Sequence, residues 1–184
     1  MVWIPPCPFT FWEENLLPKP SKQDFMRCAY NEALKAWECG EIPVGAVAVV
    51  QHSLIARAGN AVETQQDATA HAEMNLIRMI SNQRHDWRLA DVTLYVTKEP
   101  CPMCSGAILR ARIPTVGVGA WDPLQGCLGG RIHFNQALQA YHQISVEEES
   151  LQGACEQLLT TFFLLRRQQE KNADRFRIDP QQDF

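Results

Sequence analysis

The sequence predicts an α/β fold, a three-layer α/β/α sandwich with a mixed central sheet of roughly five strands. Short apolar runs rich in β-branched residues alternate with longer segments whose apolar residues recur at helical spacing. In the middle of the chain a strand-like run, a helical segment and a second strand-like run follow one another, and such a unit joins parallel strands. The 184 residues, 46% of them hydrophobic, suffice for one domain with a sizeable core.

The first helix is expected from Ser21 to about Gly40. Ser21 and Asp24 have the spacing of a capping box, apolar residues follow at helical spacing, and glycine is a common helix terminator. Two β-rich runs, 44–50 and 54–59, come next with three residues between them. This arrangement predicts a β-hairpin.

The remaining elements alternate between helix and strand. The next helix is expected over 69–80, with Asp67 or Thr69 as its N-cap, so that His71 and Glu73 fall in its first turn. The later elements are expected as a strand over 92–97, a helix from Pro102 through Ile108, a strand over 115–119, a short helix over 136–141, a strand over 144–146 and a long amphipathic helix over 150–171.

Composition divides the chain into three segments. Residues 1–20 contain five of the eleven prolines among several aromatic residues, and we expect them to form an irregular N-terminal extension. Residues 21–172 carry all the predicted helices and strands and form one expected domain. Residues 173–184 are expected to be a short C-terminal tail.

The sequence shows no sign of membrane insertion or export. No apolar run approaches the roughly 20 residues that a membrane-spanning helix needs. The proline-rich N-terminus lacks the order of a signal peptide, in which basic residues precede an apolar run. We therefore expect a cytoplasmic protein with no membrane partner. The net charge of −4 does not itself predict a nucleic-acid partner, although a local basic patch can bind RNA in an acidic protein.

His71, Cys101 and Cys104 have the chemistry and spacing of zinc ligands. The two cysteines are three residues apart, so they share one face at the start of a predicted helix. The positive end of that helix favours the thiolates that zinc requires, and thiolates with imidazole favour zinc over other metals. Three protein ligands leave the fourth tetrahedral position open, which is typical of a catalytic site.

Glu73 is the carboxylate that remains beside these ligands. It could take a proton from a zinc-activated water and deliver it to a leaving nitrogen, which predicts hydrolytic deamination. A lone histidine is usually a core residue, and a lone Cys-x-x-Cys pair can be a redox motif or half of a structural zinc site. The combination of both motifs at two helix starts favours the catalytic interpretation.

The motifs His71-Ala72-Glu73 and Pro100-Cys101-Pro102-Met103-Cys104 resemble the H-x-E and P-C-x-x-C signature of the zinc deaminases. From about Asp24 to Lys171 the chain resembles the tRNA-specific adenosine deaminases of the cytidine deaminase-like superfamily. Further segments share this resemblance in order: Ile42-Pro43-Val44-Gly45-Ala46-Val47, Gly59-Asn60, Asp67-Ala68-Thr69-Ala70, Thr93-Leu94-Tyr95-Val96-Thr97, Glu99, Gly119-Ala120, Asp122-Pro123, Phe162-Phe163 and Arg166-Arg167.

The resemblance implies a cytidine deaminase-like fold, with residues 21–172 as a zinc-dependent deaminase domain. It implies conversion of adenosine to inosine at the wobble position of a tRNA anticodon stem-loop, by a homodimer with one zinc ion per subunit. His71, Cys101 and Cys104 would be the ligands and Glu73 the catalytic proton shuttle. The expected substrate contacts are Val44 in the pocket wall, Asn60 on the target nucleoside, Asp122 on the flanking nucleotide, and Phe163 and Arg166 on the RNA-facing last helix.

Two other functions share these motifs. A small-molecule nucleobase or nucleoside deaminase, of the guanine or cytosine type, would have the same zinc chemistry without an RNA surface. A non-catalytic, zinc-stabilised RNA-binding subunit would share the ligands but would not need Glu73.

Trp121 and Leu124 stand where the family commonly has basic residues, so one set of expected phosphate contacts is missing. Trp121 is expected either to stack on a base or to be buried.

Overall fold

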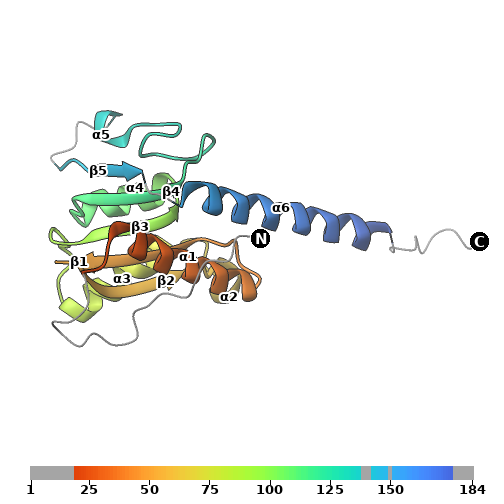
Figure 1. Ribbon diagram of the computed structural model, residues 1–184, viewed down its shortest axis with the longest axis horizontal. Helices are drawn as coiled ribbons and strands as arrows, with labels where there is room; N and C mark the ends of the chain where they lie inside the picture. The colour runs from red at the N-terminus through yellow and green to blue at the C-terminus, as the bar shows by residue number, and fades with distance from the viewer. Residues whose placement is uncertain (1–18, 138–141, 149–150, 176–184) are drawn as a thin grey trace, which may run out of the picture.

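The computed structural model describes residues 19–137, 142–148 and 151–175. One mixed five-stranded sheet lies between two layers of helices (Figure 1), which confirms the predicted three-layer sandwich. The elements in chain order are α1 (Lys22–Glu38), β1 (Gly45–Val50), β2 (Ser53–Gly59), α2 (Val62–Gln65), α3 (Ala72–Arg84), β3 (Thr93–Lys98), α4 (Pro102–Arg110), β4 (Thr115–Ala120), α5 (Phe134–Ala137), β5 (Ser145–Glu148) and α6 (Gln152–Arg175).

The sheet has the strand order β2-β1-β3-β4-β5 and contains both kinds of pairing. β1 pairs antiparallel with β2 and β3, whereas β4 pairs parallel with β3 and β5. The β3–β4 pair is the predicted crossover, since α4 connects the two strands. The carboxyl ends of β3 and β4 therefore meet at one edge of the sheet, and the candidate site lies there.

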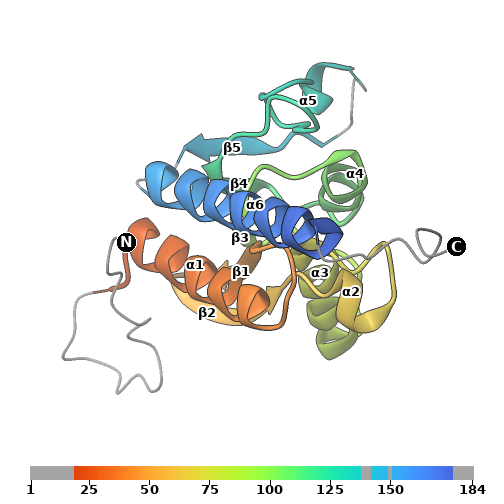
Figure 2. The same cartoon turned by 90° about the vertical axis from the view of Figure 1, so that its right-hand side faces the viewer.

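A separate apolar core fills each face of the sheet. α3 and α4 cover one face, where Leu76, Ile80 and Ile108 are fully buried. α1 and α6 lie side by side over the other face (Figure 2), where Phe25 and Leu158 are buried. Because both faces are covered, the central strands are near-continuous apolar runs in the sequence.

Local sequence signals define α1 and the hairpin as predicted. The Asp24 amide donates to the Ser21 hydroxyl at 3.3 Å, and the Ser21 amide donates to the Asp24 carboxylate at 2.9 Å, which is a reciprocal capping box. In the β1–β2 hairpin the turn residues Gln51 and His52 both have positive φ, 48° and 66°. Positive φ at both positions is the requirement of a type I′ turn, whose twist matches that of the paired strands.

The prediction for the start of α3 was wrong in one respect. The helix begins at Ala72 and His71 is its N-cap, with extended φ and ψ of −68° and 155°, so only Glu73 lies in the first turn. Asp67 does not cap α3, since its carboxylate accepts hydrogen bonds from the amide and hydroxyl of Thr69, at 2.8 and 2.7 Å, in the preceding turn.

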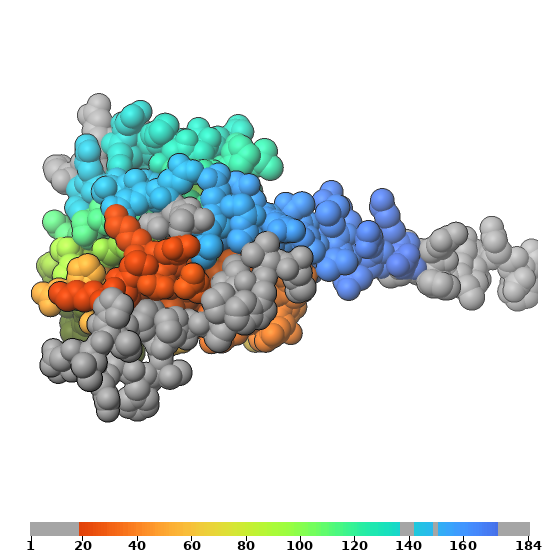
Figure 3. Space-filling model, in the orientation of Figure 1, coloured from red at the N-terminus to blue at the C-terminus, as the bar shows by residue number. Residues whose placement is uncertain are grey.

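The elements after β4 agree with the sequence where they are described. α5 overlaps the start of the helix expected over 136–141, and residues 138–141 lie outside the described residues. α6 runs past its expected end and projects from the body (Figure 3). Most of the expected N-terminal extension and C-terminal tail lies outside the described ranges, and those boundaries stay predictions. In the described part of the chain no helix has the length and apolar character to cross a bilayer.

A substitution at Gly45 tests the close packing of α1 on β1. A Cβ there would overlap the Ala29 carbonyl oxygen and the Ala33 amide nitrogen, both backbone atoms of α1. Gly45→Ala should therefore destabilise the fold by roughly 1–3 kcal/mol or more, measured as a lower midpoint of thermal unfolding. Gly153→Ala is the matched control, because a Cβ added there has no neighbour within 4 Å apart from the adjacent residues and backbone of its own helix; equal losses in both variants would contradict this account.

Candidate active site

The starts of two helices bring three potential metal ligands together. His71 is the N-cap of α3, Cys101 is the N-cap of α4, and Cys104 lies in the first turn of α4 behind Pro102. His71 Nδ1 lies 3.7 Å from Cys101 Sγ and 3.5 Å from Cys104 Sγ. The three donor atoms lie within 4.8 Å of one another, and they form the one such cluster among the described residues.

A zinc ion fits this donor set. Tetrahedral coordination with Zn–N of about 2.0 Å and Zn–S of about 2.3 Å places the nitrogen and sulfur ligands roughly 3.5 Å apart, close to both observed distances. One imidazole and two thiolates are ligands that zinc prefers. A tetrahedral zinc ion held by three protein ligands would keep one coordination position open, which is typical of catalytic zinc sites.

The two cysteine thiols respond in opposite ways to their surroundings. A hydrogen bond from the Cys104 thiol, helped by one from His71, lowers the pKa of Cys101 to about 4 in spite of partial burial. The same hydrogen bond, together with burial and the charge of Glu73, raises the pKa of Cys104. Without metal the two thiols therefore retain one proton between them, and zinc binding must release it.

Glu73 is the buried carboxyl group beside the ligands. It projects from the first turn of α3, is only 4% exposed, and lines a cavity at the site. Burial raises the pKa of Glu73, and the charge of Cys101 raises it further. A carboxyl group with a raised pKa is suited to take up a proton and pass it on.

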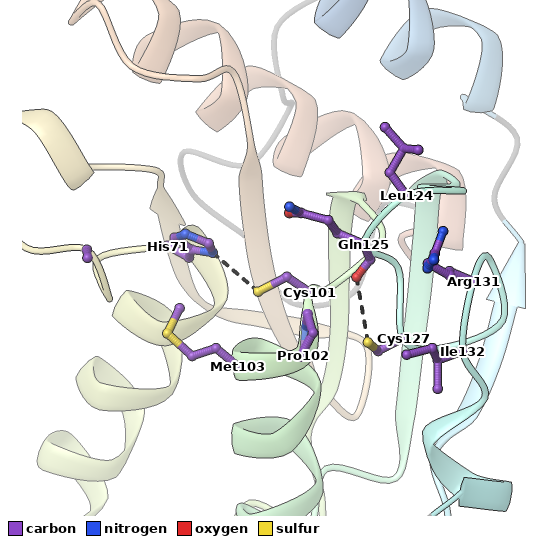
Figure 4. Close-up of a pocket in the computed structure, with 10 residues that line it drawn as sticks. His71, Cys101, Pro102, Met103, Leu124, Gln125, Cys127, Arg131 and Ile132 are labelled. Atoms are coloured by element: carbon purple, nitrogen blue, oxygen red, sulfur yellow. Dashed lines mark hydrogen bonds between the residues drawn. The ribbon is translucent and has the colours of Figure 1, made fainter.

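Two cavities adjoin the ligands, and both are lined by His71 and Cys101. The smaller cavity, of about 260 Å³, contains Glu73 in its wall. The larger, of about 460 Å³, is bounded by Met103, Leu124 and other side chains of α4 and of the loop after β4 (Figure 4). A metal ion at the three ligands would therefore border on both spaces.

Three of the five predicted substrate-contact residues line the smaller cavity, namely Val44, Asn60 and Phe163. The backbone N–H of Asn60 donates to the backbone carbonyl of Val44 at 2.9 Å, which ties these two residues together where the hairpin ends. Phe163 reaches the cavity from α6 and is 41% exposed. The cavity is thus built from segments far apart in the sequence.

Asp122 lies outside the lining of both cavities and is occupied by donors of its own chain. Its carboxylate pairs with Lys98 and accepts the amides of Leu124 and Gln125 at 2.9 and 3.1 Å. Burial acts to raise the pKa of Asp122, but the hydrogen bonds, first that of Lys98, outweigh it and lower the pKa below its ordinary value. Lys98 itself lines the smaller cavity.

α6 presents one aromatic side chain to the core and the next to the site. Phe162 is buried, and its ring packs edge to face with that of Trp37, with the ring centroids 5.4 Å apart. The Arg166 guanidinium lies 5.9 Å from the centre of the Phe162 ring and is exposed to solvent. Arg166 therefore stands on the surface beyond Phe163 rather than in either cavity.

The two departures from the family pattern lie on different sides of the loop after β4. Trp121 is half-buried and packs against the core on the face covered by α3 and α4. This favours the buried alternative of the two that the sequence left open. Leu124 is 73% exposed and lines the larger cavity.

Sequence reasoning assigned no role to Glu99, although it builds this loop. Glu99 is 2% exposed, and its carboxylate accepts the amides of Asp122, Leu128 and Gly130 at 2.8–2.9 Å. A Cβ at Gly126 or Gly130 would overlap this carboxylate. An acidic residue directly before the Pro-Cys motif, followed by a glycine-rich loop, was the available signal.

Residues 19–120 match the family model of the cytidine and deoxycytidylate deaminase zinc-binding region, a span that contains Glu73 and all three ligands. The chain belongs to this family of zinc-dependent deaminases.

Two bacterial relatives match most of the chain. The chain is 44% identical over 149 residues to the tRNA-specific adenosine deaminase of Bacillus subtilis (strain 168), covering 81% of this chain and 92% of that protein. It is 42% identical over 150 residues to the tRNA-specific adenosine deaminase of Haemophilus influenzae, covering 81% and 87%.

Solved structures agree on the fold. A structure from work on A-to-I editing by tRNA:A34 deaminases matches with a TM-score of 0.71 and 38% identity, over 73% of this chain and 98% of that one. A guanine deaminase from Bacillus subtilis matches with a TM-score of 0.53 and 38% identity, over 55% and 66%. The cytidine deaminase-like fold is therefore confirmed.

Loss of one ligand should empty the metal site. Cys104→Ser removes a thiolate, so zinc per purified chain, measured by elemental analysis, should fall from about one equivalent to a small fraction of it. Cys127→Ser is the matched control, because Cys127 is a buried free thiol that lines the larger cavity without belonging to the ligand cluster. Full zinc retention in Cys104→Ser would refute the assignment.

Proposed function

We propose that this chain converts adenosine to inosine at the wobble position of a tRNA anticodon. The observation that carries the proposal is the small cavity in which Glu73, Asn60 and Val44 face the metal ligands His71 and Cys101. A tRNA substrate is supported by relatives that match most of the chain and are tRNA-specific adenosine deaminases.

The reaction replaces the 6-amino group of adenine with oxygen from water and releases ammonia. The target base would leave its stack and enter the small cavity, whose volume of about 260 Å³ is below that of most drug-sized pockets and suits a single base. Zinc, when bound, supplies the Lewis acidity that makes water a nucleophile near neutral pH. Glu73 takes a proton from the attacking water and delivers it to the departing nitrogen.

The other predicted residues have separate tasks in this proposal. Val44 forms a wall of the base cavity, Asn60 hydrogen-bonds the target nucleoside, and Phe163 contacts the nucleotide at the exposed side of the cavity. Asp122 acts together with Lys98, which it holds at the cavity. The contact of Asp122 with the flanking nucleotide stays a prediction.

α6 supplies the proposed surface for the RNA backbone. Arg166, Arg167 and Lys171 are exposed on this helix beyond Phe163, and a run of cations can track phosphates. Because Phe163 belongs to the same helix, one element would contact both the base and the RNA backbone.

We also propose a homodimer in the cytoplasm, which the family resemblance supports.

A small-molecule nucleobase deaminase is the second candidate. It is favoured by the match to a guanine deaminase at 38% identity, although that match covers only 55% of this chain. Incubation of the zinc-loaded protein with an anticodon stem-loop that carries a wobble adenosine, and in parallel with free adenosine, guanine and cytidine, separates the two. We expect inosine in the stem-loop alone. Ammonia from a free base, with the stem-loop unchanged, would establish the second candidate.

The Glu73→Gln variant is the control for mechanism in that assay. Loss of the proton shuttle should reduce turnover by roughly 10²–10⁴-fold, while zinc content and stem-loop affinity stay near those of the wild type. Undiminished turnover would remove Glu73 from the mechanism, and full affinity without any wild-type turnover would support a non-catalytic RNA-binding subunit.

Neutralising the cations of α6 should weaken stem-loop binding and reduce its salt dependence. In Arg166→Ala/Arg167→Ala the slope of log affinity against log salt should become shallower by roughly 0.7 for each phosphate that the variant no longer neutralises, as measured by titration at several salt concentrations. Arg110→Ala is the control, because Arg110 lies in the last turn of α4, at the end of the helix away from Cys101. An unchanged slope in the double variant would count against α6 as the RNA surface.

A further inference from the structure

Glu41 is a buried carboxylate that stands outside the metal site. It follows the C-terminal end of α1, is 1% exposed, and accepts four hydrogen bonds. Burial acts to raise the pKa of Glu41, but the hydrogen bonds, led by those of Thr64, lower it below the ordinary value. Glu41 is therefore a stable anion whose orientation is set by its donors.

Three of these hydrogen bonds hold the short helix α2. The amides of Glu63 and Thr64 donate to Glu41 at 3.3 and 2.7 Å, and the Thr64 hydroxyl donates at 2.8 Å. The N-cap of α2 is Ala61, whose side chain cannot accept a hydrogen bond. Glu41 thus performs from a distance the capping that α2 lacks.

The fourth hydrogen bond fixes the amide of Asn60. Asn60 Nδ2 donates to Glu41 Oε2 at 3.0 Å, and a carboxylate can only accept, so the nitrogen of this amide faces Glu41 and Oδ1 faces away from it. Asn60 is 8% exposed and lines the small cavity. Within the described chain no donor is bonded to Oδ1, which leaves this atom available to a ligand.

We propose that Glu41 is a positioning residue for the deamination: it holds the Asn60 amide in one orientation, so that Oδ1 is presented to the nucleoside in the small cavity. This inference rests on the proposed function, because it takes Asn60 to contact the nucleoside. The bond from the Ala61 amide to the Ala70 carbonyl, at 3.0 Å, joins the same segment to the residue before His71. The segment whose side chain Glu41 orients is therefore tied by its backbone to the start of α3.

Glu41→Gln disturbs the hydrogen bond that orients the Asn60 side chain, while it keeps the size of the side chain at position 41. Its new NH₂ group meets either the amide donors of Asn60 and Glu63 or the donors of Thr64. Where it meets Asn60, the Asn60 amide must turn over or lose its partner; where it meets Thr64, Asn60 donates to a neutral carbonyl oxygen, in a bond weaker than one to a carboxylate. A misplaced substrate contact can lower a rate by up to about 10²-fold, and we expect kcat/KM on the stem-loop to fall on the order of tenfold, chiefly through KM.

A double-mutant cycle with Asn60→Ala tests whether Glu41 acts through Asn60. Once Asn60 is absent, Glu41→Gln should cause little further loss of kcat/KM, so the two losses should not multiply. Losses that multiply would overturn the proposal. If Glu41→Gln does not fold, the same cycle is run with Glu41→Asp, which keeps the charge and shortens the side chain.

Thr64→Val separates positioning from capping. Thr64 is exposed on α2, and the substitution deletes the hydroxyl that donates to Glu41. It leaves the hydrogen bond of Asn60 untouched. This variant should unfold at a lower temperature while kcat/KM stays within about twofold of the wild type, since only a local contact is removed. A loss of kcat/KM equal to that of Glu41→Gln would assign the effect to α2 and overturn the proposal.

The side-chain NH₂ resonances of Asn60 give a measurement that does not depend on the substrate. They are assigned by their absence in Asn60→Ala, and they should shift in Glu41→Gln but remain in place in Thr64→Val. If the wild type leaves the stem-loop unchanged while these shifts occur, the proposed function fails and the orientation by Glu41 stands. If the wild type is active and the resonances are the same in Glu41→Gln, the inference fails alone.

Discussion

The site depends on one packing arrangement: α3 and α4 lie on the same face of the sheet and begin at the same edge. Because His71 and Cys101 are the N-caps of these helices, any shift of one helix against the other changes the distance between imidazole and thiolate. The apolar contacts of Leu76, Ile80 and Ile108 beneath the helices therefore set the spacing of the potential ligands. Glu73, in the first turn of α3, is placed by the same contacts.

Buried carboxylates organise the loops around this arrangement. Glu99 gathers the amides of the loop after β4, and Glu41 gathers those of α2. Without these carboxylates the inward-facing N–H groups would lose their acceptors, and an unsatisfied buried amide costs about 1–3 kcal/mol. The walls of the cavity are thus held by charge that is removed from water and fully hydrogen-bonded, which gives rigidity without regular secondary structure.

Much of the fold and the metal site could be predicted from the sequence, because those features have local signals. The capping box of Ser21 defines α1, and the spacing of Cys101 and Cys104 predicts the potential ligand cluster. Glu41 had no local signal, and Glu99 had only its place before the Pro-Cys motif and the glycine-rich loop, since each acts on amides about 20 to 30 residues away. The N-cap position of His71 also escaped prediction, because Asp67 and Thr69 are better capping residues by composition and were engaged with each other instead.

The outer half of α6 bears on how such an enzyme changes over evolution. From Phe163 to Asn172 no side chain of this helix is buried, so substitutions there have little effect on folding. The chemistry, by contrast, lies in the constrained starts of α3 and α4. Under the proposed function, a lineage can therefore vary the surface of this helix, and with it the range of molecules it engages, without disturbing bond cleavage, and the two traits can drift under separate selection.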